Sequence, residues 1–221
     1  MNEPRKARIS PLKQPKQARS NDLVAAILEA AVQVLEREGA RRFTTARVAE
    51  KAGVSVGSLY QYFPNKAAIL FRLQSDEWRE TTAMLRGILE DTAQPPFERV
   101  RTLVHTFIRS ECAEAGMRTA LDDAAPLYRD APEAMAAKAG GQRILAIFLQ
   151  EALPEVAEEQ RELAADVMKA TLSSVGANFS ATPRTDTQIL RYADAMADMF
   201  CAYLEGLGRQ SAASSEQSLK D

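Results

Sequence analysis

The sequence lacks most of the groups that enzymes use for catalysis. Among 221 residues there is one histidine, one tryptophan and two cysteines. His105 has no nearby cysteine or carboxylate pattern that would mark it as a general base, and no glycine-rich phosphate loop is present. A single histidine also excludes a di-iron helical bundle, which needs two Glu-x-x-His motifs. We therefore expect no enzymatic activity, no metal and no cofactor.

Paired cysteines and long apolar runs are also missing. Cys112 and Cys201 fit no metal or redox spacing, so we expect free thiols in a reducing cytoplasm. No run of about 18 apolar residues occurs, and no apolar segment follows the basic N-terminus as it would in a secretory signal. A composition of 46% hydrophobic and 26% charged residues is typical of a folded protein. We expect a cytoplasmic protein with no membrane contact.

Sustained alternation of apolar and polar residues, the mark of strands, is absent as well. Apolar residues instead recur at three and four positions in segments rich in alanine, leucine and glutamate, which predicts an all-α fold of about nine helices. Besides two short helices, we expect helices at about 21–38, 65–91, 97–115, 117–125, 131–150, 155–180 and 184–207. Ser20 or Asn21 is expected to cap the first, and Gly39 suits the left-handed turn at its end.

Positive charge is concentrated near the N-terminus. Residues 1–66 hold 12 Lys or Arg and 6 Asp or Glu, a net charge of +6, whereas the rest of the chain holds 16 and 24, a net charge of −8. This asymmetry favours contact between the N-terminal part and a polyanion, the alternative being a solvated charge run. Residues 1–19 and 210–221 are polar, and we expect them to be a disordered basic arm and a disordered tail.

Residues 44–66 have the pattern of two short helices joined by a tight turn. Thr44 or Thr45 can cap the first helix, Gly53 permits the turn and Ser55 can cap the second. The apolar positions expected to face inward are Val48, Ala49, Ala52, Val54, Leu59 and Phe63. Two short helices joined by a glycine turn are typical of the helix-turn-helix.

The outward face of the second short helix carries groups that suit DNA. Gln61 can form two hydrogen bonds to adenine, and Val56 can contact a thymine methyl group. Tyr60 and Tyr62 can donate to phosphates, and Lys66 with the first N–H groups of the next helix can hold another. Gly57 and Ser58, at the start of this helix, are small and allow it to approach closely in the major groove.

This stretch resembles the signature of the TetR family of repressors, over roughly residues 21–70. The residues that carry the resemblance are Thr44-Thr45, Val48-Ala49, Ala52-Gly53-Val54-Ser55, Gly57-Ser58-Leu59-Tyr60 and Tyr62-Phe63-Pro64-Asn65-Lys66. The resemblance implies phosphate contacts from Thr44, Ser55, Tyr60, Tyr62 and Lys66 and base contacts from Val56, Gly57, Ser58 and Gln61. Thr45 and Arg47 are further candidate DNA contacts. Val56 departs from the family, in which this position is often polar.

The resemblance also implies a domain order. A three-helix DNA-binding domain would span residues 20–66, and a larger helical domain for effector binding and dimerisation would span 67–209. The long helix that begins at Asn65 would link the two. The helices at about 155–180 and 184–207 would pair with their copies in a homodimer, the alternative being that their apolar stripes form an ordinary intramolecular core.

An effector pocket is expected among the helices at about 78–150. The candidate ligand contacts are Trp78, Met84, His105, Phe107, Met117, Arg118, Tyr128 and Phe148, each of which also fits plain core or, for Arg118, surface. The sequence thus predicts a ligand-responsive repressor that binds a palindromic operator in double-stranded DNA as a homodimer and is released by an unidentified small molecule. The alternatives are a transcriptional activator and a helical protein-interaction module with only non-specific DNA affinity.

Overall fold

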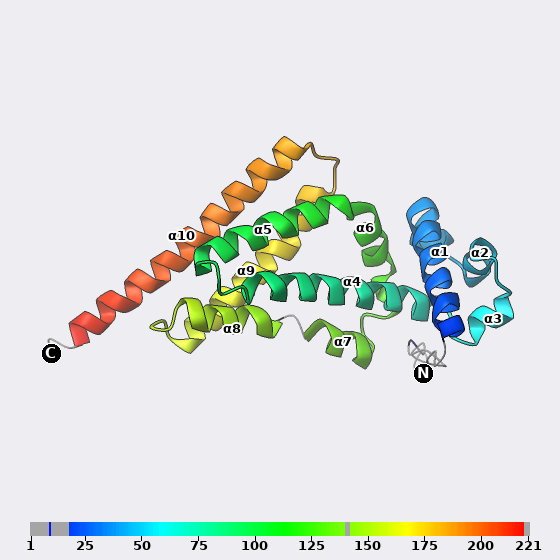
Figure 1. Cartoon of the computed structure of the whole chain (residues 1–221), viewed down its shortest axis with the longest axis horizontal. Helices are drawn as coiled ribbons and strands as arrows, with labels where there is room; N and C mark the ends of the chain where they lie inside the picture. The colour runs from blue at the N-terminus through cyan, green and yellow to red at the C-terminus, as the bar shows by residue number, and fades with distance from the viewer. Residues whose placement is uncertain (1–8, 10–17, 140–141, 219–221) are drawn as a thin grey trace, which may run out of the picture. The chain divides into compact units, whose positions relative to one another are not determined.

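The computed structural model describes residues 9, 18–139 and 142–218 (Figure 1). These residues form ten α-helices and one short 3₁₀ helix and contain no strand. The predicted all-α fold is therefore confirmed. Among the described helices, none is long and apolar enough to cross a membrane.

The chain divides into two compact units. Unit 1 consists of residues 1–80 and 116–139, and unit 2 consists of residues 81–115 and 140–221. The division falls inside one long helix, α4 (Lys66–Leu89), rather than at residue 66, the predicted domain boundary. The reason is that the first part of α4 buries Ala67, Ile69, Leu70 and Leu73 in the core of unit 1.

Unit 1 contains the two predicted short helices. Its helices are α1 (Ala18–Arg42), α2 (Thr45–Lys51), α3 (Val56–Tyr60), the first part of α4, α6 (Ala115–Ala124), the 3₁₀ helix Ala125–Leu127 and α7 (Pro132–Ala139). Helix α1 packs against α2, and α2 packs against α3. The largest fully buried side chains of this core are Ile27, Leu35, Phe43, Leu59, Ile69, Leu70 and Leu121.

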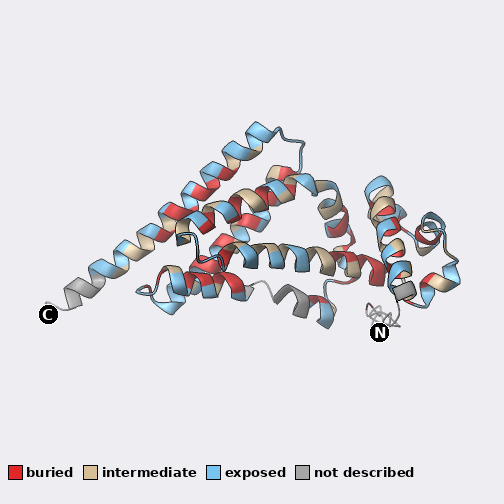
Figure 2. Cartoon of the chain, viewed as in Figure 1, coloured by how far each residue is buried: buried red, intermediate tan, exposed pale blue. Residues whose placement is uncertain are grey.

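Unit 2 is built from longer helices. After the last part of α4 come α5 (Pro96–Ala113), α8 (Gln142–Ala152), α9 (Glu158–Ser180) and α10 (Asp186–Ser218). Helix α5 packs against α9 and α10, and α8 packs against α9. On α10, Ala193, Met196 and Phe200 are buried within the unit, as the red segments of this helix in Figure 2 show. This part of the stripe predicted for dimerisation is therefore intramolecular core.

Two predicted boundaries in the C-terminal half are wrong. The helix expected at 131–150 is two helices, α7 and α8, on either side of Gly140 and Gly141, which lie outside the described residues. Helix α10 continues to Ser218, so the prediction of a disordered tail fails for residues 210–218. No glycine or proline interrupts these residues, and the Ser211 hydroxyl donates to the carbonyl of Glu155.

The N-terminal predictions also need correction. Helix α1 begins at Ala18, so Ser20 and Asn21 lie inside it and neither is its cap. Most of the predicted disordered arm lies outside the described residues, but Ile9 is 2% exposed and belongs to the core of unit 1. Gly39 has the positive φ expected of it, 71°, but its ψ of 170° differs from that of a left-handed helical turn, and the chain then continues as helix to Arg42.

Candidate DNA-binding site

Helix α2 begins at a side-chain cap. Thr44 is extended (φ −135°, ψ 150°), and its Oγ1 accepts a hydrogen bond from the backbone N–H of Arg47 at 3.3 Å. The structure thus selects Thr44 over Thr45 as the cap. Val48 and Ala49 are buried, as predicted, and fix the inner face of this helix against the core of unit 1.

The turn after α2 depends on Gly53. Its φ is 67°, in the left-handed region that favours glycine. The Gly53 N–H donates to the carbonyl of Glu50 at 3.1 Å, and the Val54 N–H donates to that of Ala49 at 3.0 Å. Val54 is partly buried against the core, which confirms that it fills the corner between the two short helices.

Helix α3 begins at a second side-chain cap. Ser55 Oγ accepts from the backbone N–H of Ser58 at 3.0 Å and lies 2.8 Å from the Ser58 hydroxyl. Leu59 is fully buried and Phe63 is 2% exposed, so the inner face predicted for this helix is confirmed. These contacts make α2, the turn and α3 a helix-turn-helix.

The outer surface of α3 is available to a partner. Val56 is 39% exposed and Tyr60 is 43% exposed, and Gln61 is exposed too. The Tyr60 hydroxyl lies 3.1 Å from Thr45 Oγ1, at the start of α2. Because this hydrogen bond joins the start of α2 to the end of α3, the predicted contacts Thr45 and Tyr60 lie on one surface.

Tyr62 does not fit the outward position predicted for it. Its side chain is 6% exposed and belongs to the core of unit 1 together with Phe63. Helix α3 ends at Tyr60, and the Tyr62 N–H donates to the carbonyl of Leu59 at 3.0 Å as the chain turns toward α4. This turn directs the Tyr62 ring inward, so its substitution would disturb the core as well as any contact with DNA.

Lys66 is the first residue of α4 and is partly buried. Before it, Asn65 Oδ1 accepts from the backbone N–H of Ala68 at 2.9 Å and so caps this helix. This cap was not among the predicted features, although an asparagine directly before a helical run is a known signal for one. The cap holds Lys66 at the start of the long helix, as the predicted phosphate contact requires.

Arg47 is already engaged within the protein. Its guanidinium forms an ion pair with Glu38 of α1. The pair lies in an open groove of about 400 Å³ between α1 and α2, lined by Gln33, Val34, Arg37, Glu38, Arg47, Glu50 and Lys51. A contact between Arg47 and DNA would therefore compete with Glu38.

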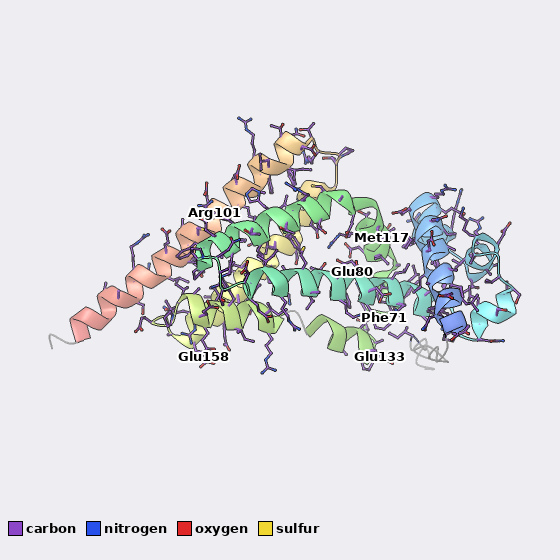
Figure 3. All side chains as sticks on the ribbon, in the orientation of Figure 1. Phe71, Glu80, Arg101, Met117, Glu133 and Glu158 are labelled. Atoms are coloured by element: carbon purple, nitrogen blue, oxygen red, sulfur yellow. The ribbon has the colours of Figure 1, made fainter. Side chains whose placement is uncertain are left out.

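Four of the predicted ligand contacts belong to unit 1: Trp78, Met117, Arg118 and Tyr128. Arg118 forms an ion pair with Glu77 at 2.7 Å. The buried Tyr128 hydroxyl lies 3.2 Å from Gln74 Oε1 and 3.1 Å from the carbonyl of Leu121, and burial raises the pKa of this phenol. These polar groups lie between α4 and α6, which carry the labelled Phe71 and Met117 in Figure 3.

The other four predicted ligand contacts belong to unit 2: Met84, His105, Phe107 and Phe148. His105 Nε2 lies 3.0 Å from Asp194 Oδ1 on α10. Phe107 and Phe148 are buried in the core, and the Arg99 guanidinium lies 5.2 Å from the centre of the Phe148 ring. Most of these side chains thus have intramolecular roles. In the described part of the chain, no group of three or more His, Cys, Asp or Glu side chains could hold a metal ion.

Two family models match this chain. Residues 27–73 match the model described as bacterial regulatory proteins, tetR family. Residues 95–207 match the model described as tetracyclin repressor-like, C-terminal domain. The first match contains α2, α3 and their caps, and the second contains most of unit 2.

The curated relatives match a smaller part of the chain. The nucleoid occlusion factor SlmA of Vibrio campbellii is 36% identical over 107 residues, which are 47% of this chain and 53% of that protein. The SlmA of Alteromonas mediterranea is 35% identical over 81 residues, 37% of this chain and 34% of that protein. The chain thus spans about half, or less, of the length of the curated relatives that it matches.

Solved structures match most of the chain at low identity. The fatty acid degradation regulator FadR from Bacillus halodurans has a TM-score of 0.66 at 19% identity, covering 85% of this chain and 96% of that one. A TetR-family transcriptional regulator from Mesorhizobium loti has a TM-score of 0.68 at 18% identity, covering 85% and 98%. FadR from Bacillus subtilis in complex with stearoyl-CoA has a TM-score of 0.60 at 19% identity, covering 80% and 96%. These similarities establish the fold.

Proposed function

This chain belongs to the TetR family of bacterial regulatory proteins, and on that premise we propose that it is a homodimeric transcriptional repressor released from its operator by a small molecule. One observation carries the proposal. Two short helices, each begun by a side-chain cap and joined by a hydrogen bond between Thr45 and Tyr60, leave the outer surface of α3 exposed. Such a surface suits the major groove of DNA.

The exposed residues divide into two kinds of contact. Gln61 and Val56 face bases, where Gln61 discriminates adenine through two hydrogen bonds and Val56 contacts a thymine methyl group. Ser55, Tyr60 and Lys66 contact phosphates and fix the register without reading sequence. Substitutions in the two groups should therefore differ in whether they change affinity for all DNA or for the operator alone.

The test is a titration against DNA fragments recovered by a genome-wide pull-down, including the region upstream of the protein's own gene. Gln61→Ala should relax the choice at one base pair by about 1–3 kcal/mol, because the buried polar edge of adenine loses its partner. Lys66→Gln should weaken binding to operator and random DNA alike and lower the salt dependence. Failure of the pull-down to enrich any site, together with equal affinity for all fragments, would contradict the proposal and favour non-specific DNA affinity.

A second copy of the chain is the partner proposed for unit 2. Large apolar side chains remain exposed on α9 and α10, namely Leu163 (59%), Val167 (42%), Leu190 (49%) and Met199 (50%). Exposed apolar side chains that recur at helical spacing are typical of an interface between copies. A dimer also follows from the size of one recognition helix, which reads only a few base pairs.

The dimer is tested by sedimentation of wild-type protein and of a Leu163→Glu/Val167→Glu variant. The wild type should sediment as a dimer and the variant as a folded monomer with weak operator binding, since two charges would be buried in the interface. Met135→Glu is the matched control, because Met135 is 58% exposed but lies in unit 1. A variant that remains dimeric would place the interface elsewhere.

The effector is the least specified part of the proposal. The Bacillus subtilis FadR structure holds stearoyl-CoA, so this acyl-CoA is the first compound to add to the operator complex. Release of DNA by stearoyl-CoA but not by coenzyme A would assign the acyl chain as the recognised group. If neither compound releases DNA, stearoyl-CoA is not the effector, and other apolar ligands would be screened in the same way. A reporter in a deletion strain would distinguish repression from activation.

A role in nucleoid occlusion is the second candidate function, favoured by the 36% identity to the Vibrio campbellii SlmA over 107 residues. The same pull-down distinguishes the two. Sites upstream of genes whose transcripts rise in a deletion strain support a repressor. Sites spread over the chromosome without transcript changes would support nucleoid occlusion.

A further inference from the structure

We propose that Arg41 and Arg42, at the end of α1, form an additional contact to the DNA backbone beside the helix-turn-helix. The inference rests on the proposed DNA-binding function and adds two residues to its phosphate-contacting set. Both arginines are exposed, and no ion pair joins either of them to another described residue. Their positive charges are therefore available to a polyanion.

The backbone holds this pair of arginines in a defined place. On one side, Gly39 (φ 71°, ψ 170°) turns the chain at the end of the regular part of α1. On the other side, Phe43 is fully buried and anchors the chain in the core of unit 1. Arg41 and Arg42 are thus held between a fixed turn and a buried anchor, so little freedom of the backbone is lost when they bind.

The position of the pair is at the start of α2. Successive Cα atoms are about 3.8 Å apart, so the Cα of Arg42 lies within about 8 Å of that of Thr44. Thr44 caps α2, and the next residue, Thr45, hydrogen-bonds to Tyr60 of the recognition helix. The two arginines therefore lie next to the surface proposed to face DNA.

The geometry of helix-turn-helix complexes defines the partner. When the second helix enters the major groove, the first helix crosses the sugar-phosphate backbone that borders it. Cations beside the start of α2 then meet phosphates, to which a guanidinium group donates two parallel hydrogen bonds. Arg47 is less suited to this contact because it is paired with Glu38, whereas Arg41 and Arg42 require no exchange of partners.

The test compares Arg41→Gln/Arg42→Gln with the wild type on the pulled-down operator and on random DNA over a range of salt. Each phosphate contact contributes about 0.9 to the slope of log affinity against log salt, so the slope should fall by about 2. The ratio of wild-type affinity to variant affinity should fall roughly tenfold between about 50 mM and about 200 mM salt, on both DNAs. Arg41→Lys/Arg42→Lys should restore most of the slope because it retains the charges.

The matched control is Arg109→Gln/Arg191→Gln, which removes two exposed arginines from α5 and α10 of unit 2. This variant should retain the wild-type slope, and all variants should retain the wild-type melting temperature. An Arg41→Gln/Arg42→Gln slope equal to that of the wild type would overturn the inference even if the operator is bound tightly. Absence of any preference of the wild type for the operator would instead contradict the proposed function, while the slope on random DNA still tests the arginines.

Discussion

The two short helices of the helix-turn-helix in unit 1 and two long helices of unit 2, α5 and α9, begin in different ways. In unit 1, the 7-residue α2 and the 5-residue α3 begin at the capping side chains of Thr44 and Ser55. In unit 2, the 18-residue α5 and the 23-residue α9 follow Pro95 and Ala157, which provide no side-chain cap. Short helices have few internal hydrogen bonds to offset the cost of nucleation, so caps and turns decide their geometry. The uncapped α5 and α9 are held by their packed faces instead.

Unit 2 depends on close packing between helices. A Cβ atom on Gly176 of α9 would lie 3.1 Å from Cε1 of Phe107 and 3.3 Å from Cγ of Glu111, both on α5. Helix α10 differs from α5 and α9, because Thr185 and Gln188 hydrogen-bond reciprocally at its start, as in a capping box. The geometry of the helix-turn-helix is therefore fixed by local contacts, whereas the body of unit 2 is held by contacts distant in sequence.

The largest expected effect comes from removing one buried ring from each unit. Phe43→Ala and Phe200→Ala should each lower the free energy of unfolding by about 3–5 kcal/mol, because each leaves a cavity in a packed core. Trp78, the only tryptophan, belongs to unit 1, so its fluorescence in urea reports that unit. Phe43→Ala should shift the fluorescence transition more than Phe200→Ala does. Equal shifts in both variants would mean that the two cores unfold together.

A smaller effect is expected from filling the close approach between α5 and α9. Gly176→Leu should destabilise the protein by about 1–3 kcal/mol, measured by far-UV circular dichroism in urea, since the added atoms overlap Phe107 and Glu111. Gly206→Leu on α10 is the control, because a Cβ at that position meets nothing within 4 Å. If Gly176→Leu were as stable as the control, close packing would not be what holds α9 against α5.

Removal of a helix cap from unit 1 should lower the free energy of unfolding by about 1 kcal/mol. Thr44→Ala removes the acceptor for the Arg47 N–H. It should lower the free energy of unfolding, measured in urea by Trp78 fluorescence, by about 1 kcal/mol. Ser173→Ala, which removes an exposed hydroxyl from the middle of α9, should change stability by less than about 0.5 kcal/mol. A Thr44→Ala protein with wild-type stability would show that packing of Val48 and Ala49 fixes α2 without the cap.

The difference between local and long-range contacts explains which features the sequence could predict. The cap at Ser55, the left-handed Gly53 and the buried Leu59 follow rules that act within a few residues, and all three are confirmed. Tyr62 was misplaced because its direction depends on how the chain turns from α3 into α4. That turn is set by the core rather than by helical periodicity.

The predicted ligand contacts, by contrast, depend on partners that are distant in sequence. Arg118 pairs with Glu77 of another helix, and Phe148 contacts Arg99 of another helix. No local pattern in the sequence reveals such partners, so residue type alone could not separate ligand contacts from core. The end of α10 was missed for a different reason, because a polar segment without glycine or proline is compatible with both helix and disorder.

The smallest expected effect is a change in pH dependence within unit 2. The buried Arg99 guanidinium donates to Glu151 and lowers the pKa of that carboxyl group. A carboxyl group whose pKa is lower in the folded state stabilises the protein above its unfolded pKa of about 4.3, and this contribution is lost as pH falls through the folded value. The urea midpoint of the wild type should therefore fall as pH decreases from about 5 to about 3, and that of Arg99→Met should fall less.

Arg109→Met, which removes an exposed arginine from the same helix, should keep the wild-type pH dependence. Identical acid dependence in all three proteins would mean that the pair adds nothing to stability, as is common where one partner is open to solvent.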